Sequence, residues 1–247
     1  MIERLAARDL PAMRKAGAAA AATLKEVGSR LRPGISTATI DRWVRELTAA
    51  QGGTPSQLGY HGFPAAVCTS RNHVVCHGIP GPELLADGDI INVDVTTCLG
   101  GFHGDTSTTF MIGECSEQAR HVVDIARRAR DLGVSLVAPG VRVGDIGAAI
   151  EDFVKRHGCT SVHEFGGHGI GRRMHQAPTV PFVGPAGRGT RLAVGMAITI
   201  EPMVNLGGAD IHTLDDGWTV VTADGSLSAQ FEHTVIVTER GAEITTR

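Results

Sequence analysis

The chain repeats its own residue pattern at a nearly constant interval, and this repeat constrains the fold more than any other feature. Seven positions of the first half have similar residues 106 positions later: Pro33, Gly34, Ile35, Ile40, Val44, Leu47 and Gly52 are matched by Pro139, Gly140, Val141, Ile146, Ile150, Phe153 and Gly158. Four more match at an interval of 107, namely Gly88, Ile91, Val93 and Asp94 with Gly195, Ile198, Ile200 and Glu201. Two runs at almost one interval indicate an internal duplication.

Each half is predicted to contain two helices and paired strands. The first half favours helices from Asp9 to Arg32 and from Thr37 to Ala50, and the apolar period changes to two between Ala65 and Ile112. The second half favours helices from Glu117 to Val137 and from about Asp145 to His157. A Pro-Gly pair or a glycine follows each helix, as is typical of helix ends.

We therefore expect an α+β fold with pseudo-twofold symmetry. A short N-terminal segment, 1–8, would precede two pseudo-repeats that cover about 9–112 and 113–247. No linker-like or low-complexity stretch separates the halves, so residues 1–247 are predicted to form one domain, which agrees with the chain length.

The composition excludes several classes of protein. With 42% hydrophobic residues, 20% charged residues and a net charge of −3, the chain is neither disordered nor a general nucleic-acid binder. No apolar run reaches the ~18–20 residues of a membrane span, and no signal peptide is recognisable. The five cysteines are an odd number without a C-x-x-C pair, so we expect free thiols in a reducing, cytoplasmic compartment.

Two aspartates are predicted to share one face of a hairpin. Asp94 lies in an alternating strand pattern, and Asp105 follows it across Leu99-Gly100-Gly101. A Leu99-Gly100 turn would pair the two aspartates directly, whereas a Gly100-Gly101 turn would make them diagonal neighbours on the same face. Adjacent carboxylates repel each other and raise one pKa unless a cation joins them.

The duplication predicts a second carboxylate pair near the first. Glu201 is equivalent to Asp94, and Glu232 lies in a strand pattern that can return beside it. Four carboxylates carry a charge of about −4, which two divalent cations neutralise. His168, which has glycines on both sides, is a candidate nitrogen ligand, and this donor set suits Mn, Fe(II) or Co(II), with zinc also compatible.

Five short motifs carry a resemblance to a known family: Asn92-Val-Asp94-Val, His103-Gly-Asp105-Thr, Gly167-His168-Gly-Ile-Gly171, Thr199-Ile-Glu201-Pro and Phe231-Glu232-His-Thr. From about residue 8 to the C-terminus the chain resembles type I methionine aminopeptidases of peptidase family M24. The resemblance implies the pita-bread (creatinase/aminopeptidase) fold, an internally duplicated domain whose curved antiparallel sheet is covered by helices. It also implies a single catalytic domain that removes the initiator methionine from nascent proteins and peptides when the second residue is small.

The resemblance assigns metal-binding roles to the five candidates. It implies that Asp94 binds one divalent ion, that His168 and Glu201 bind the other, and that Asp105 and Glu232 bridge the two. Coordination by metal ions lowers the pKa of water enough to give a nucleophile at neutral pH. Glu201 also matches the family's proposed proton shuttle.

The resemblance also implies catalytic histidines and a substrate pocket. His77 matches the histidine near the scissile amide nitrogen, and His175 matches the one that hydrogen-bonds the substrate carbonyl and its developing oxyanion. A free α-amine that reaches a metal would explain exopeptidase action. The residues that match the methionine pocket are Tyr60, His61, Phe63, Cys68 and Trp218.

Two pocket residues depart from the family's pattern. Met174 stands where phenylalanine is usual, and Gln57 stands where cysteine is common. Because a thioether is soft and adaptable, we expect Met174 still to pack against a methionine side chain as part of the substrate site. The departures concern the shape of the pocket and its inhibitor preference rather than the reaction.

Two other functions fit parts of the sequence. Proline-directed peptidases of the same fold, such as aminopeptidase P or prolidase, carry an additional N-terminal domain, for which about eight residues before the first helix leave no room. An inactive pita-bread module that binds protein or RNA would typically lack metal ligands, whereas this chain keeps all five candidates. Arg127, Arg128 and Arg130 are interpreted as a solvated helix face rather than a nucleic-acid patch. The remaining histidines are expected to be solvated or structural, except for His61, which is intermediate: His73, His103, His121, His157, His163, His212 and His233.

The expected partner is the N-terminal methionine of nascent polypeptides. No basic or zinc-finger N-terminal extension is present, so ribosome docking through such a segment is not supported, and transient ribosome association stays open. We expect no membrane or specific nucleic-acid partner. A monomer is expected, because no apolar stripe is left after the helices are assigned to a core.

Overall fold

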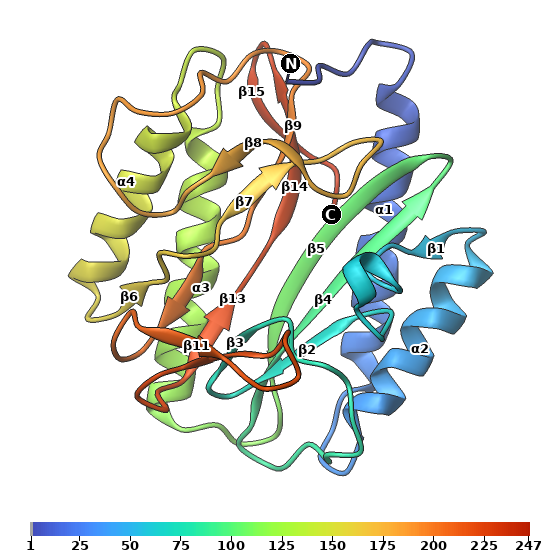
Figure 1. The fold of residues 1–247 in the computed structure, drawn as a ribbon, viewed down its shortest axis with the longest axis vertical. Helices are drawn as coiled ribbons and strands as arrows, with labels where there is room; N and C mark the ends of the chain where they lie inside the picture. The colour runs from blue at the N-terminus through green and yellow to red at the C-terminus, as the bar shows by residue number, and fades with distance from the viewer. Residues whose placement is uncertain (1) are drawn as a thin grey trace.

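The computed structural model describes residues 2–247, which form helices and mostly antiparallel strands (Figure 1). The helices are α1 (Leu10–Arg30), α2 (Thr37–Ala50), α3 (Glu117–Leu136) and α4 (Val143–Arg156), with a short 3-10 turn η1 (Tyr60–Gly62). The strands of the first half are β1 (Thr54–Pro55), β2 (Cys68–Arg71), β3 (Val74–Cys76), β4 (Ile90–Leu99) and β5 (Phe102–Met111). Those of the second half are β6 (Thr160–Ser161), β7 (Gly167–Gly169), β8 (Gln176–Val180), β9 (Ala197–Ile200), β10 (Met203–Asn205), β11 (Ile211–Thr213), β12 (Val220–Thr222), β13 (Ser228–Gln230), β14 (His233–Thr238) and β15 (Gly241–Ile244).

The four predicted helices are confirmed, and their ends agree with the predictions to within two residues. α2 and α3 each begin after a serine whose hydroxyl accepts the first-turn N–H, Ser36 from Thr39 and Ser116 from Ala119. α4 begins two residues before the predicted Asp145. The reason is that the Asp145 carboxylate accepts a hydrogen bond from the Arg142 N–H at 3.0 Å, so Asp145 occupies the third helical position and caps the N-terminus from within the first turn.

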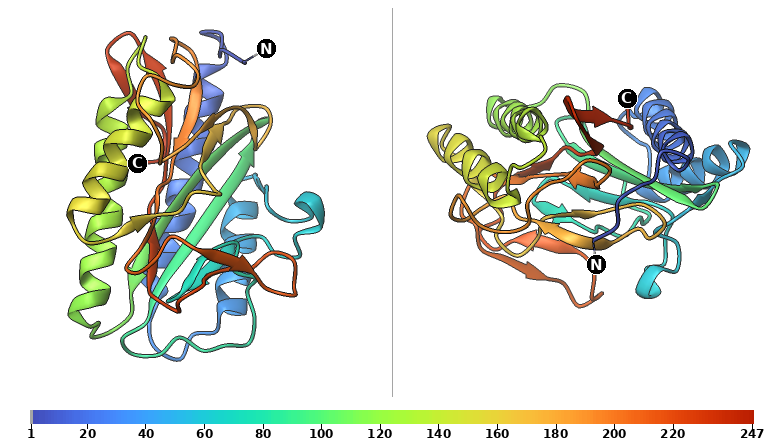
Figure 2. Two further views of the ribbon diagram at one scale, coloured as in Figure 1. Left: turned by 60° about the vertical axis from the view of Figure 1, so that its left-hand side comes forward. Right: turned by 90° about the horizontal axis from the view of Figure 1, so that it is seen from above.

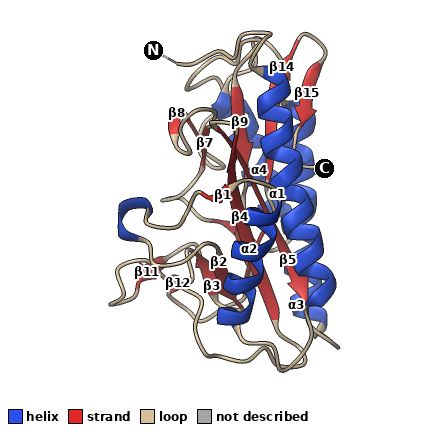
Figure 3. Ribbon diagram, turned by 90° about the vertical axis from the view of Figure 1, so that its right-hand side faces the viewer, coloured by secondary structure: helices blue, strands red, loops and turns tan. Residues whose placement is uncertain are grey.

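The helices lie behind the strands in the view of Figure 1. α1 and α2 are on one side of the molecule, and α3 and α4 are on the other (Figure 1). Side and top views place α1 and α3 on one face of the strands, with η1 and the β11–β12 hairpin projecting from the other (Figures 2 and 3). The contact between α1 and β5 is close: a Cβ on Gly104 would lie 2.5 Å from the Ala16 backbone. The residue at this position must therefore be glycine.

The duplication predicted from the sequence is visible in the backbone. The matched glycines share left-handed conformations: φ is 86° and 89° at Gly34 and Gly140, and 90° and 89° at Gly88 and Gly195. The isolated bridge Ser36–Leu84 of the first half recurs as Arg142–Arg191 in the second. Equivalent positions of the two halves therefore have the same backbone conformation and pairing.

The β4–β5 register settles the choice left open for the hairpin. Leu99 pairs with Phe102 and Thr96 pairs with Asp105, so Gly100-Gly101 is the turn. Both glycines have positive φ, 60° and 79°, which a two-residue hairpin turn of this kind requires. Asp94 and Asp105 are therefore diagonal neighbours on one face of the hairpin.

The two halves of the chain meet at β5. The Glu232 N–H donates to the Ser107 carbonyl at 3.0 Å, and the Asp105 N–H donates to the Thr234 hydroxyl at 3.1 Å. The Thr234 hydroxyl donates in turn to the Asp105 carbonyl at 2.8 Å. These bonds fix Glu232, which directly precedes β14, next to the β4–β5 hairpin.

Within residues 2–247, no helix combines the length and the hydropathy that a bilayer crossing requires. The five cysteines are free, as their number and spacing predict.

Candidate active site

Asp94 and Asp105 enter the site from the β4–β5 hairpin. Asp105 is buried, and its Oδ1 accepts a hydrogen bond from the Thr96 hydroxyl at 2.7 Å. The Gln57 amide faces Asp94, with Nε2 2.8 Å from the carbonyl oxygen and 3.4 Å from Oδ1. Thr96, on β4, thus orients the Asp105 carboxylate, and Gln57, at the edge of β4, orients that of Asp94.

Glu201 and Glu232 enter from the second half of the chain. Glu201 directly follows β9, and its two carboxylate oxygens accept hydrogen bonds from the Thr199 hydroxyl at 2.6 Å and the Gln230 amide at 3.1 Å. Glu232 lies between β13 and β14 and is only 2% exposed. Its Oε1 is buried and has no hydrogen-bond partner within the part of the chain that the structure describes. A buried carboxylate oxygen without a donor is costly unless a cation satisfies it.

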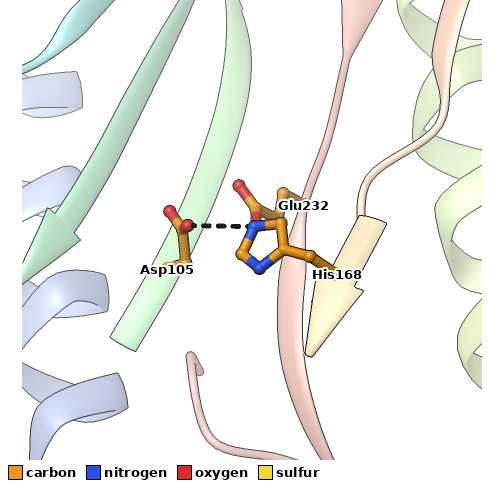
Figure 4. A group of neighbouring side chains, drawn as sticks. All are labelled: Asp105, His168 and Glu232. Atoms are coloured by element: carbon orange, nitrogen blue, oxygen red, sulfur yellow. Dashed lines mark ion pairs between the residues drawn. The ribbon is translucent and has the colours of Figure 1, made fainter. Parts of the chain in front are cut away.

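His168 lies beside Asp105 and Glu232, which come from different halves of the chain (Figure 4). Its Nε2 is 3.7 Å from Asp105 Oδ2 and 3.5 Å from Glu201 Oε1. Its Nδ1 donates to the Gly169 carbonyl at 3.0 Å, which leaves the Nε2 lone pair directed at the acids. Burial, followed by the neighbouring His175, lowers the pKa of His168 to about 3, so the ring is neutral and suited to bind a metal ion.

The glycines beside His168 allow close packing of the strands around it. A Cβ on Gly167 would lie 2.4 Å from the Thr199 carbonyl oxygen, and one on Gly169 would lie 2.2 Å from the Ala177 carbonyl oxygen. β7 can therefore lie close to β8 and β9 only without side chains at these two positions. This close packing holds the imidazole over the carboxylates.

If all four acids were ionised, this buried site would hold more negative charge than is stable without a cation. Burial raises the pKa of Asp105 to about 6 and, with repulsion from Asp105, raises that of Glu201 to about 8. Burial and the neighbouring carboxylates raise the pKa of Asp94 and of Glu232 well above the ordinary range. Such mutual repulsion is relieved when a cation joins the group.

The donor set fits a divalent cation. Asp105, His168 and Glu232 each offer one ligand atom, and these atoms lie within 4.8 Å of one another. The unpartnered Glu232 Oε1, the neutral His168 and the raised carboxyl pKa values all favour a bound cation at this place. The site is therefore a candidate divalent metal centre.

One cavity of about 210 Å³ joins this centre to an apolar wall. Gln57 and Thr96 line this cavity. The rest of its lining consists of all the site residues selected from the sequence: Tyr60, His61, Phe63, Cys68, His77, Asp94, Asp105, His168, Met174, His175, Glu201, Trp218 and Glu232. The rings of Phe63 and Trp218 meet edge to face at 5.1 Å, and the buried Met174 also lines the cavity. The size and lining suit one long apolar side chain next to the polar centre.

His77 and His175 lie in different parts of this cavity. The His175 ring is 4.2 Å from the His168 ring and 5.0 Å from the Tyr60 ring. Burial, with the nearby His77, His61 and His103, lowers the pKa of His175 to about 4. His77 lies 5.4 Å from the Phe165 ring and 6.3 Å from the Trp218 ring, and its backbone has a φ of 56°. A left-handed conformation is uncommon for a non-glycine residue and often marks a functional position.

Three polar residues that orient the acids were missed in the sequence: Thr96, Thr199 and Gln230. The signal was present, because each is two positions from a candidate acid and strand alternation places it on the same face.

Most of the residues set aside as structural have ordinary partners. The His103 ring bonds to the Ser56 hydroxyl at 2.8 Å. Arg127 and Arg128 are exposed on α3 and pair with Asp124, as expected for a solvated face. Arg130 differs, because its side chain is only 12% exposed and its guanidinium lies 5.5 Å from the centre of the Phe231 ring.

Comparisons with known proteins agree with this geometry. Residues 11–239 match the model of metallopeptidase family M24, which covers most of the chain. The chain belongs to this family. It is 48% identical over 246 residues to methionine aminopeptidase A of Synechocystis sp., covering 99% of this chain and 97% of that protein. The crystal structure of methionine aminopeptidase from Rickettsia prowazekii superposes with a TM-score of 0.98 at 41% identity, over the full length of both chains.

The fold is shared more widely within the M24 peptidases. Xaa-Pro dipeptidase from Bacillus anthracis aligns with a TM-score of 0.81 at 23% identity, covering 99% of this chain and 62% of that one. At this level of identity, the likeness bears on fold alone. The predicted α+β, pita-bread architecture is thus confirmed, and this M24 chain is a metallopeptidase.

Proposed function

We propose that this chain is a methionine aminopeptidase that removes the N-terminal methionine from nascent proteins and peptides whose second residue is small. The observation that carries the proposal is the single cavity in which four acids and His168 adjoin a wall formed by Phe63, Met174 and Trp218. A cavity of about 210 Å³ with an apolar wall beside a polar centre suits a thioether side chain. Relatives that carry this name match over nearly the whole chain.

We further propose two divalent cations, of Mn, Fe(II) or Co(II), with zinc also compatible. Asp94 would hold one, His168 and Glu201 the other, and Asp105 and Glu232 would bridge them. The charge of four carboxylates and the orphaned Glu232 Oε1 support this number. When bound, such ions lower the pKa of a coordinated water and polarise the scissile carbonyl.

The protein's own groups would orient the substrate and move the proton. The pocket of Tyr60, His61, Phe63, Cys68 and Trp218, together with Met174, would take the methionine side chain. His175 would donate to the substrate carbonyl oxygen, and His77 would lie near the amide nitrogen. Glu201, held by Thr199 and Gln230, would take a proton from the attacking water and pass it to the leaving nitrogen.

The proposal is tested with metal-reconstituted protein. We expect Met-Ala-Ser to be cleaved after methionine in the presence of Mn(II), Fe(II) or Co(II), with Asp105→Asn reduced to background. X-Pro peptides serve as the competing substrates, because prolidase-type enzymes share the fold. Exclusive X-Pro cleavage would overturn the substrate assignment, and wild-type activity no higher than that of Asp105→Asn would favour an inactive binding module.

The same proposal covers the setting in which the enzyme acts. We propose that residues 1–247 act as one catalytic domain of two pseudo-repeats, as a monomer in the cytoplasm, without a membrane or nucleic-acid partner. Nascent chains as substrates support transient contact with the ribosome. Analytical ultracentrifugation tests the monomer, and co-sedimentation with ribosomes tests the contact.

A further inference from the structure

The edge of β4 is covered by two short strands that leave a gap at the metal centre. β1 pairs with β4 at Thr97 and Cys98, and β2 pairs with it from Ile91 to Asp94. Between them, the C=O of Asp94 and the N–H of Thr96 face the same edge. A gap in a buried ladder leaves polar groups that need other partners.

The side chain of Gln57 fills this gap. Its Nε2 donates to the Asp94 carbonyl at 2.8 Å, and its Oε1 accepts from the Thr96 N–H at 3.1 Å. The amide thus makes the pair of bonds that a strand backbone would make. Gln57 is 6% exposed, so water does not replace these bonds.

The same amide faces the carboxylate of Asp94. Nε2 lies 3.4 Å from Asp94 Oδ1, so the amide nitrogen donates to the side chain as well as to the backbone of Asp94. With Oε1 taken by Thr96, little hydrogen-bonding capacity is left for a substrate. Gln57 lines the cavity, but its amide forms its hydrogen bonds with β4.

Gln57 also begins the loop that forms one wall of the cavity. Its carbonyl accepts from the Tyr60 N–H at 3.0 Å, and the Gly59 N–H donates to the Phe63 carbonyl at 2.8 Å. The loop carries Tyr60, His61 and Phe63 into the cavity lining. The residue that anchors this wall is therefore the residue that holds the Asp94 and Thr96 backbones.

We propose that Gln57 is a positioning residue that couples the wall of the substrate pocket to the Asp94 side of the metal centre. This inference deepens the proposed function and rests on it. A cysteine at this position is too short to reach both Asp94 and Thr96. The coupling is therefore a property of the glutamine in this chain.

The test replaces the amide with a side chain of similar length that forms no hydrogen bonds, Gln57→Met. In metal-free protein, we expect faster hydrogen exchange at the Thr96 amide and across residues 57–63, because the Thr96 N–H loses its acceptor. Mn(II) affinity, measured by calorimetry, should fall about 10- to 100-fold, as for other partners of metal ligands. At saturating Mn(II), KM for Met-Ala-Ser should rise more than kcat falls.

Two further variants make the result specific. Gln57→Asn keeps the amide but shortens the side chain, so it should give a smaller change of the same kind. Gln51→Met is the matched control, because the Gln51 amide also makes two hydrogen bonds, to Thr23 Oγ1 and the Leu47 carbonyl, outside the cavity. It should leave Mn(II) affinity and Thr96 exchange unchanged.

The coupling is refuted if Gln57→Met binds Mn(II) within twofold of wild type, or if Thr96 exchange does not change. A lack of aminopeptidase activity in the wild type would instead refute the proposed function. The exchange and affinity measurements would still be valid in that case, so the two failures are distinguishable.

Discussion

His77 and His175 contact the cavity from surroundings that differ from those of His168. The His168 Nε2 lies within 4 Å of two carboxylates, whereas the ring neighbours of His77 are the aromatic side chains Phe165 and Trp218. The His175 ring packs at a tilt against the rings of His168 and Tyr60. These surroundings support the proposal that His168 binds a metal ion, whereas His77 and His175 act on the substrate.

These proposed roles predict different effects of mutation. His77→Ala and His175→Ala should each keep the bound metal but lower kcat about 10²- to 10³-fold, because each removes a group that we propose to act on the reacting amide. Metal content by mass spectrometry and steady-state kinetics on Met-Ala-Ser check this expectation. A large loss of metal in either variant would show that the residue is a ligand instead.

Gly169 fixes the position of His168 by lacking a side chain. Gly169→Ala would bring a Cβ to within 2.2 Å of the Ala177 carbonyl oxygen, so β7 must move away from β8. We expect a loss of about 1–3 kcal/mol in the free energy of unfolding, as for other overpacked sites, together with weaker metal binding. Gly208→Ala is the control, since its Cβ would meet nothing closer than 3.5 Å. Equal effects of the two variants in chemical denaturation would contradict the steric argument.

At the scale of elements, the β11–β12 hairpin positions one wall of the cavity through a single aspartate. Asp216 accepts hydrogen bonds from the Trp218 and Thr219 N–H groups, each at 2.8 Å, and from the Thr219 hydroxyl at 2.6 Å. Trp218 then packs edge to face against Phe63 in the cavity lining. The turn thus holds the indole, although Asp216 itself does not line the cavity.

Asp216→Ala should therefore act on substrate binding more than on catalysis. We expect KM for Met-Ala-Ser to rise about 5- to 10-fold, equivalent to roughly 1–1.4 kcal/mol, with little change in kcat. Asp224→Ala is the matched control, because Asp224 also accepts N–H groups in a nearby turn, from Gly208 and Ser226, but lies outside the cavity lining. A similar rise in KM in both variants would count against a specific role of the Asp216 turn.

Much of this arrangement could be predicted from the sequence, because it depends on local patterns. The helical periods and Pro-Gly ends gave the four helices, and the repeat interval linked Asp94 with Glu201. The hairpin register was not decided, since Leu99-Gly100 and Gly100-Gly101 are both turn-compatible. Arg130 was misread as solvated because a charged residue on a helix gives no sign of the Phe231 ring beside it. Such contacts depend on packing between distant segments.

At the scale of the whole molecule, duplication concentrates charge at the junction of the halves. Asp94 and Asp105 come from one half, Glu201 and Glu232 from the other, and the bonds between β5 and residues 232–234 hold them together. The fold therefore maintains a buried acidic cluster whose stability depends on protons or on cations.

Metal-free protein should consequently lose stability between pH 6.5 and 8.5. The pKa of Glu201 is raised to about 8, and those of Asp94 and Glu232 are raised well above normal, so the folded state binds more protons than the unfolded chain. Stability from such groups is complete below their unfolded pKa of about 4 and is lost as the pH rises through the folded value. The lowered pKa values of His168 and His175 act in the opposite direction, but only below about pH 6.5.

We expect the melting temperature of metal-free protein to fall by roughly 2–4 °C for each kcal/mol lost across this range. Mn(II) should raise the melting temperature more at pH 8.5 than at pH 6.5, because the cation replaces the protons that the acids have released. Glu201→Gln, which cannot titrate at this position, should show a shallower decline without metal. A melting temperature that rises over this range would mean that the acids do not carry the pH dependence of stability. A decline that Glu201→Gln leaves unchanged would mean that Glu201 has no part in it.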